Sequence, residues 1–383
     1  MSPQAKPRLR WFDANRVAAA MGVVLIHSTA DFSGQVYPAS SVAERFGPVL
    51  FRSIAEFSGS EMFFFFSLFL MAMRVDRGRP TYGSAVWLQA ERLLIPFAFW
   101  TIFYAFFRVL KADSFHYLPH YLDQLAHWQT WASFFLLGTA QYHLHFLPTL
   151  FLLFLFYPVM RLGMRYPILG LTLFATLGAM DNAQGFLWSQ PVDPMLRDYL
   201  IRGLKVFGYV GYGLAAFSIY GLWKDGIPRG ESKLIWRGCL YFAAMAYFAT
   251  LPFFGAALSS GSWGVRAGWS FYGHFLMPVF MFGLFMGAQY GDWSPRWTKL
   301  AQVTFGVSLV PPMMIDLFDI AIYRSGLSAM MSPTLTVLTR YALVLPAALL
   351  FAVGLSRLKL TAWTIGLGET PWSRLRPEPK PQS

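Results

Sequence analysis

Ten apolar runs of about 20 residues each recur along this chain, and they constrain its fold more than any other feature. They lie near residues 12–31, 50–73, 86–110, 140–160, 167–182, 199–222, 237–258, 269–290, 301–321 and 337–357. A helix rises about 1.5 Å per residue, so about 20 apolar residues cross the hydrocarbon core of a bilayer. Only 13% of the 383 residues are charged, against about 25% in soluble domains. The sequence therefore predicts an all-α, polytopic membrane helix bundle with about ten transmembrane helices.

The Lys and Arg residues between the runs predict the side of the membrane that each loop faces. If the N-terminus is cytoplasmic, six segments face the cytoplasm, and they hold 19 of the 31 Lys and Arg residues. These segments are 1–11, 74–85, 161–166, 223–237, 291–300 and 357–383. Each holds at least two basic residues, which is the bias of the positive-inside rule. We expect cytoplasmic tails at 1–11 and 358–383, one transmembrane domain at 12–357 and, because the net charge of +12 is dispersed, no nucleic-acid partner.

Several ionisable side chains lie inside the apolar runs, where a charge is costly unless it faces the protein interior or a wet cavity. Arg16 and His27 are eleven residues apart in the first run. A helix separates them by about 16 Å along its axis and directs them to nearly the same face. Asp13 lies three residues before Arg16 and can pair with it. From spacing alone, His27 is as consistent with hydrogen-bonded packing as with a functional role. For Arg16 alone, an interfacial anchor is a better interpretation than a functional role.

The first run, WFDANRVAAAMGVVLIHSTADF, resembles the first helix of membrane acyltransferase family three, in which ten residues separate an arginine from a histidine. Further stretches resemble later motifs of that family, in the same order. They are SEMFFFFSLFLM, QAERLLIPFAFW, AQYHLHFLPTLFLLFLFYPV and TFGVSLVPPMMID. The resemblance covers residues 11 to about 357. Four residues depart from the usual pattern, with Leu68 replacing a glycine, Ile95 an arginine, His145 a tryptophan and Pro311 a histidine.

The resemblance implies an O-acyltransferase of the bacterial inner membrane that moves an acetyl or succinyl group from cytoplasmic acyl-CoA to a hydroxyl of a cell-envelope or exported glycan. Acyl-CoA is then a co-substrate, and we expect no bound cofactor and no metal site. A sugar hydroxyl needs a base within hydrogen-bond reach, and a neutral imidazole can accept its proton. His27 is our candidate general base. We expect Arg16 and Arg92 to bind the phosphates of the donor, because a guanidinium binds phosphate through two parallel hydrogen bonds.

Glu61 and two further histidines are candidates for the same site. Glu61 lies in the second run, where it can orient His27 or bind an acceptor hydroxyl, with a structural ion pair as the alternative. His143 matches the first histidine of the fourth family motif, so the resemblance implies an acceptor-binding role near the active cavity. His145 is two positions further on, and a regular helix would direct the two side chains to different faces.

Lys205 is the remaining candidate for substrate binding. It lies three residues after Arg202 in the sixth run, so the two are neighbours on one helix face. The pair can hold the carboxylate of a dicarboxylic acyl group, or it can form ion pairs with Glu61 or Asp316. His274, inside the eighth run, is interpreted as a packing histidine.

Two other functions are compatible with the sequence. A transporter or flippase for a lipid-linked glycan or a small anion would also carry charges at membrane depth, although such proteins often contain internal repeats, which we do not find here. A non-catalytic relative is the third hypothesis, because of Leu68 and Pro311. The partners we expect are acyl-CoA, a glycan acceptor and membrane lipid, whereas the sequence leaves the acyl group, the acceptor and the oligomeric state open.

Overall fold

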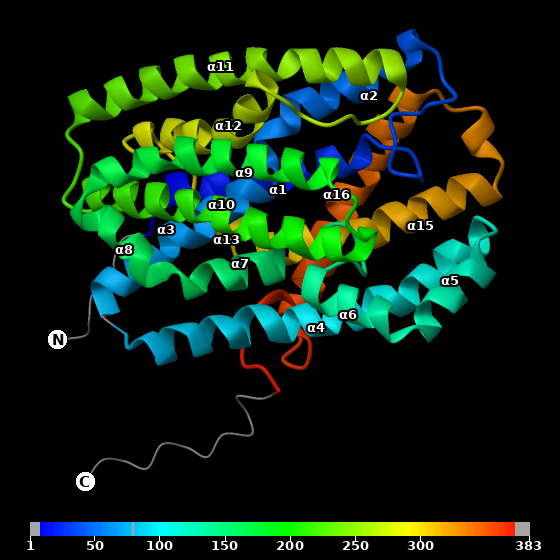
Figure 1. Cartoon of the computed structure of the whole chain (residues 1–383), viewed down its shortest axis with the longest axis horizontal. Coiled ribbons are helices and arrows are strands. Elements are labelled where there is room, and N and C mark those ends of the chain that lie inside the picture. The colour runs from blue at the N-terminus through cyan, green and yellow to red at the C-terminus, as the bar shows by residue number, and fades with distance from the viewer. Residues whose placement is uncertain (1–7, 79, 372–383) are drawn as a thin grey trace.

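The computed structural model describes residues 8–78 and 80–371, and its regular structure in these residues is helical (Figure 1). The α-helices are α1 (Arg10–Ser28), α2 (Val42–Ala55), α3 (Ser60–Gly78), α4 (Tyr82–Ser114), α5 (Leu118–Ala126), α6 (Trp128–Leu137), α7 (Phe146–Leu155), α8 (Tyr157–Arg165), α9 (Thr172–Ser189), α10 (Pro194–Trp223), α11 (Arg229–Ser260), α12 (Trp269–Gly287), α13 (Arg296–Ala301), α14 (Thr304–Leu309), α15 (Pro311–Arg324) and α16 (Pro333–Arg357). Short 3-10 helices are η1 (Glu56–Ser58), η2 (Pro167–Leu171), η3 (Leu327–Ala329) and η4 (Ala362–Ile365). The prediction of an all-α membrane bundle is confirmed. The outer parts of both predicted tails, 1–7 and 372–383, lie outside the described residues.

Six helical segments in the described chain are long and apolar enough to cross a membrane, and seven if α7 and α8, bent by 66° at their junction, form one span. They are Val42–Gly78, Tyr82–Ser114, Pro194–Trp223, Arg229–Ser260, Trp269–Gly287 and Pro333–Arg357. The predicted number of ten is therefore not confirmed. Part of the difference is the run at 301–321, which is broken into α13, α14 and α15. The first run forms α1, but Asp13, Asn15 and Arg16 lower its mean hydropathy.

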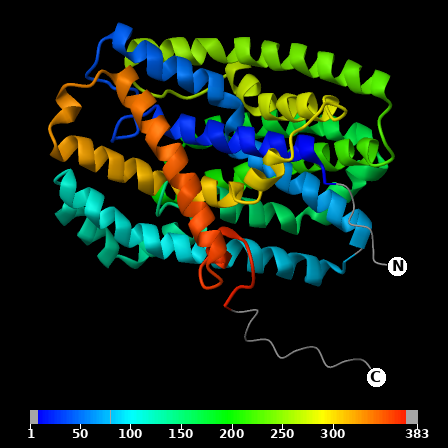
Figure 2. The same ribbon diagram turned by 180° about the vertical axis from the view of Figure 1, so that it is seen from behind.

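Helix α1 lies in the middle of the bundle, and α16 crosses the bundle obliquely on the side seen in Figure 2. Helix α1 packs against η1, α2, α3 and α12, and also against α13, α14, α15 and α16. Near its N-terminus, Trp11 and Phe12 form a cluster with Phe69 of α3 and Phe282 of α12, with ring centroids 5.6 to 6.5 Å apart. Such aromatic packing fixes the first helix as part of the core.

Helix α10 lies very close to its neighbours because glycines face them. A Cβ atom on Gly211 would lie 2.9 Å from the Cα atom of Leu173 in α9. A Cβ atom on Gly221 would lie 2.9 Å from the carbonyl oxygen of Met164 in α8. Small residues allow membrane helices to approach at this distance and to gain van der Waals contacts. The wall that α9 and α10 form is therefore tightly constrained.

Candidate active site

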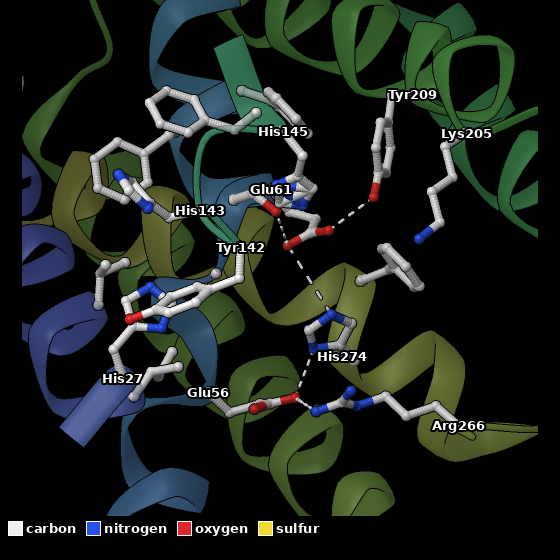
Figure 3. Close-up of a pocket in the computed structure, with 18 of the residues that line it drawn as sticks. His27, Glu56, Glu61, Tyr142, His143, His145, Lys205, Tyr209, Arg266 and His274 are labelled. Atoms are coloured by element: carbon white, nitrogen blue, oxygen red, sulfur yellow. Dashed lines mark hydrogen bonds and ion pairs between the residues drawn. The ribbon is translucent and has the colours of Figure 1, made fainter. Parts of the chain in front are cut away.

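A cavity of about 390 Å³ lies inside the bundle, toward the end at which α1 finishes (Figure 3). Its walls come from α1, α2, η1, α3, α7, α9, α10, α12 and α14, from the turn before α7 and from the loop before α12. The lining includes four histidines and two glutamates, namely His27, His143, His145, His274, Glu56 and Glu61. Small-molecule sites typically occupy about 300 to 1,000 Å³ and carry a few polar groups on apolar walls. The size and lining of this cavity therefore suit a substrate site.

His27 reaches the cavity from the last turn of α1. Its ring packs against Tyr142, with centroids 4.7 Å apart. Within the described part of the chain, neither of its ring nitrogens is hydrogen-bonded to another protein group. The imidazole is therefore available to a molecule in the cavity.

Two arginines and one aspartate hold the end of α1 in place. The guanidinium of Arg340, in α16, donates to the carbonyl oxygens of Ser28 and Ala30, at 2.8 and 2.5 Å. Arg340 also forms an ion pair with Asp319, at 2.6 Å. Arg52 donates to the carbonyl oxygen of Ile26, at 3.2 Å. The last carbonyls of a helix lack partners within the helix, so these contacts satisfy them and fix the turn that carries His27.

Glu61 reaches the cavity from the first turn of α3. Its Oε1 atom accepts a hydrogen bond from the hydroxyl of Tyr209, at 2.8 Å. Its Oε2 atom lies 3.9 Å from Nε2 of His274. Among the described residues, no hydrogen bond or ion pair joins Glu61 to His27. The two share a cavity, and the imidazole that faces Glu61 is that of His274.

Glu56, Arg266 and His274 form a group that sequence reasoning missed. Nδ1 of His274 lies 2.6 Å from Oε1 of Glu56, and the same oxygen accepts from the guanidinium of Arg266. Figure 3 shows one chain of contacts from Arg266 through Glu56, His274 and Glu61 to Tyr209. His274 was interpreted as a packing histidine, but its position inside an apolar run was itself the signal, since ionisable residues there usually face a functional interior.

His143 and His145 lie in a turn and not within a helix, because α7 begins only at Phe146. The expectation that they point to different helix faces is therefore wrong, and both line the cavity. Nε2 of His143 lies 3.1 Å from the carbonyl oxygen of Leu309, and its ring packs edge-on against Tyr104. His143 is thus held by α4 and α14.

Lys205 and Arg202 line the cavity from α10. Neither of the carboxylate partners suggested for this pair lies within ion-pair distance in the described structure. Asp316 pairs with Lys111 instead, at 2.7 Å. The expectation of an ion pair to Asp316 is therefore wrong, because α15 directs this carboxylate toward α4.

Arg16 and Arg92 lie away from the cavity, whose described lining does not include them. Arg16 donates to the hydroxyl of Thr304, at 2.9 Å. Its expected partner Asp13 accepts from Arg8 and Thr298, at 3.1 and 2.8 Å, so the expected contact between Asp13 and Arg16 is replaced. Arg92 is exposed on α4.

A comparison with protein-family models found one that matches residues 9–357, and its description is an acyltransferase domain. Searches of curated proteins and of solved structures found no match. The matched range includes every helix from α1 to α16 in full, and it contains all the residues that line the cavity. The chain is therefore a multi-pass membrane O-acyltransferase that belongs to the acyltransferase 3 family.

Proposed function

We propose that this protein transfers an acetyl or succinyl group from cytoplasmic acyl-CoA to a hydroxyl of a cell-envelope or exported glycan. The observation that carries the proposal is the position of His27, whose unbonded ring lines a cavity of about 390 Å³ in a member of an acyltransferase family. The dispersed positive charge of the loops supports a bacterial inner-membrane location with both termini in the cytoplasm.

His27 is the general base of the proposed reaction. It removes the proton of the acceptor hydroxyl while the oxygen attacks the thioester carbonyl. The new carbon–oxygen bond forms, the carbon–sulfur bond breaks, and the proton passes from the imidazolium to the leaving thiolate. The products are the O-acyl glycan and CoA. His143 and His145 are proposed to hydrogen-bond the acceptor, and Glu61 to hold its hydroxyl.

Arg16 and Arg92 are proposed to bind the phosphates of the donor at the cytoplasmic side. Arg16 precedes His27 by eleven residues, which is about 16 Å along α1. The long pantetheine arm of CoA extends from its nucleotide phosphates to its thioester, so a donor with phosphates at one end of α1 can reach the cavity at the other.

The experiment is a CoA-release assay on purified protein with acyl-CoA and envelope glycans, followed by mass analysis of the glycans. His27→Ala should abolish release, with a loss of about 10²- to 10⁴-fold typical for removal of a general base. His120→Ala is the matched control, because His120 lies on the exposed side of α5 outside the cavity. Undiminished release by His27→Ala would overturn the mechanism, and transport of a glycan without CoA release would replace the proposal with a transporter.

A further inference from the structure

The two basic residues on the α10 wall of the cavity have no carboxylate partner within the described residues. The guanidinium of Arg202 donates only to neutral oxygens, the hydroxyl of Thr149 at 3.2 Å and the carbonyl of Leu137 at 3.3 Å. The ammonium of Lys205 makes no hydrogen bond or ion pair in the described chain. Both side chains are half-buried, so part of their hydration is lost without an ion pair to a described carboxylate in exchange.

The carboxylates nearest to this pair are already used or lie at the surface. Glu61 accepts from the hydroxyl of Tyr209 and faces His274, and no ion pair joins it to Lys205. Asp198, one helical turn before Arg202, is exposed and forms no ion pair among the described residues. Charged residues inside a membrane protein usually pair with each other or serve a substrate. The pair therefore lacks a structural explanation.

The cavity as a whole has an excess of positive charge. Four basic residues line it, and they are Arg52, Arg202, Lys205 and Arg266. In the described lining, only two carboxylates oppose them, and one of these, Glu56, is engaged by Arg266 and His274. An excess of buried cations favours a ligand that brings negative charge.

A second cavity of about 360 Å³ adjoins the first and shares Gln184, Arg202 and Lys205 with it. Its other lining residues come from α6, α9 and the start of α10, and they include the exposed Trp188 and Asp198. The basic pair therefore stands at the boundary of two cavities, and a ligand in either one can contact it.

We propose that Lys205 and Arg202 form a carboxylate-binding subsite, and that the preferred substrate of this protein carries a free carboxylate. The inference rests on the proposed acyl transfer and specifies its substrate class. Figure 3 places Lys205 across the cavity from His27, with its ammonium directed into the cavity. A dicarboxylic acyl group with its thioester at His27 extends its second carboxylate toward this wall. An acidic sugar that enters through the adjoining cavity presents the same group.

The test measures kcat/KM in two arms with the purified full-length protein. The first arm compares succinyl-CoA with acetyl-CoA on a neutral glucan, and the second compares a glucuronate-containing oligosaccharide with that glucan, using acetyl-CoA. We expect a preference for the carboxylate-bearing substrate in one arm. Lys205→Met should reduce this preference about 10- to 100-fold, as for loss of a hydrogen bond to a charged group, and Lys205→Arg should retain most of it.

Two further variants make the test decisive. Lys233→Met removes an exposed ammonium from α11, outside both cavities, and should leave the preference unchanged. If Lys205→Met does not fold, as judged by thermal unfolding, Arg202→Gln gives the same test, because it removes the positive charge and keeps a side chain with N–H donors.

The arm that shows the preference identifies the source of the carboxylate. Loss of this preference in Lys205→Met supports the subsite. If neither arm shows a difference in kcat/KM between its two substrates, the subsite is overturned while acyl transfer stays intact. The same holds if Lys205→Met retains the preference in full. Absence of CoA release from every donor would instead contradict the proposed function. In that case the subsite is tested by the increase in Tm that each donor causes. We expect Lys205→Met to reduce the increase caused by succinyl-CoA and to leave that caused by acetyl-CoA unchanged.

Discussion

His274 connects two carboxylates that lie on different elements of the bundle. Its Nδ1 atom lies 2.6 Å from Oε1 of Glu56, and its Nε2 atom lies 3.9 Å from Oε2 of Glu61. A carboxylate bound to one imidazole nitrogen fixes the orientation of the ring and the location of its proton. Glu56 is buried and also held by Arg266, so it directs the other nitrogen of His274 toward Glu61 and the cavity.

We predict that Glu56→Gln lowers kcat by about 10- to 100-fold, as is common for residues that orient a functional group. The amide keeps the shape of the side chain but cannot neutralise Arg266, and it gives His274 an amide in place of a carboxylate oxygen. Glu56→Asp, which keeps the carboxylate, should recover part of the rate. CoA release measures the effect, and Glu231→Gln on the exposed first turn of α11 is the control. A Glu56→Gln enzyme with normal kcat would show that this contact only stabilises the fold.

The ion pair between Arg340 and Asp319 should be critical for stability. Arg340 is 2% exposed and Asp319 is 4% exposed, so removal of the guanidinium leaves a buried carboxylate without its partner. We predict that Arg340→Met destabilises the protein by about 3–5 kcal/mol. Thermal unfolding in detergent measures the loss. The double variant Arg340→Met/Asp319→Asn should recover part of it, and equal stability of the single variant and the wild type would refute this interpretation.

The contact between α9 and α10 should not tolerate a methyl group at its centre. We predict that Gly211→Ala lowers the free energy of unfolding by about 1–3 kcal/mol, the usual cost of overpacking. Its Cβ atom would lie 2.9 Å from the Cα atom of Leu173, which is backbone and cannot turn aside. Gly203→Ala, on the same helix, is the matched control, because no described atom outside its own stretch of helix backbone lies within 4 Å of its Cβ position. Thermal unfolding should show a lower Tm for Gly211→Ala alone, and identical Tm values would contradict the close approach.

The pattern of apolar and ionisable residues is enough to predict the all-α membrane class and much of the candidate site. Long apolar runs report helices directly, because a helix in a bilayer satisfies its own backbone hydrogen bonds and exposes only its side chains. The cost of an ionisable residue at membrane depth is equally local, so the positions of His27, Glu61 and Lys205 inside apolar runs mark them as candidates. The apolar run at 301–321 predicts one helix, but the structure has three, because hydropathy does not indicate the breaks that separate α13, α14 and α15.

Which of these groups come into contact depends on how the helices pack. Glu56 and His274 are 218 positions apart, and no local pattern indicates that η1 and α12 bring them into contact. The turn before α7 directs His143 and His145 into one cavity, although helical spacing would have separated them. Lys205 had two suggested carboxylate partners, and packing brought neither within ion-pair distance. Side-chain pairing depends on how whole helices pack against each other, and the glycines and aromatic rings that fix this packing act between segments distant in the chain.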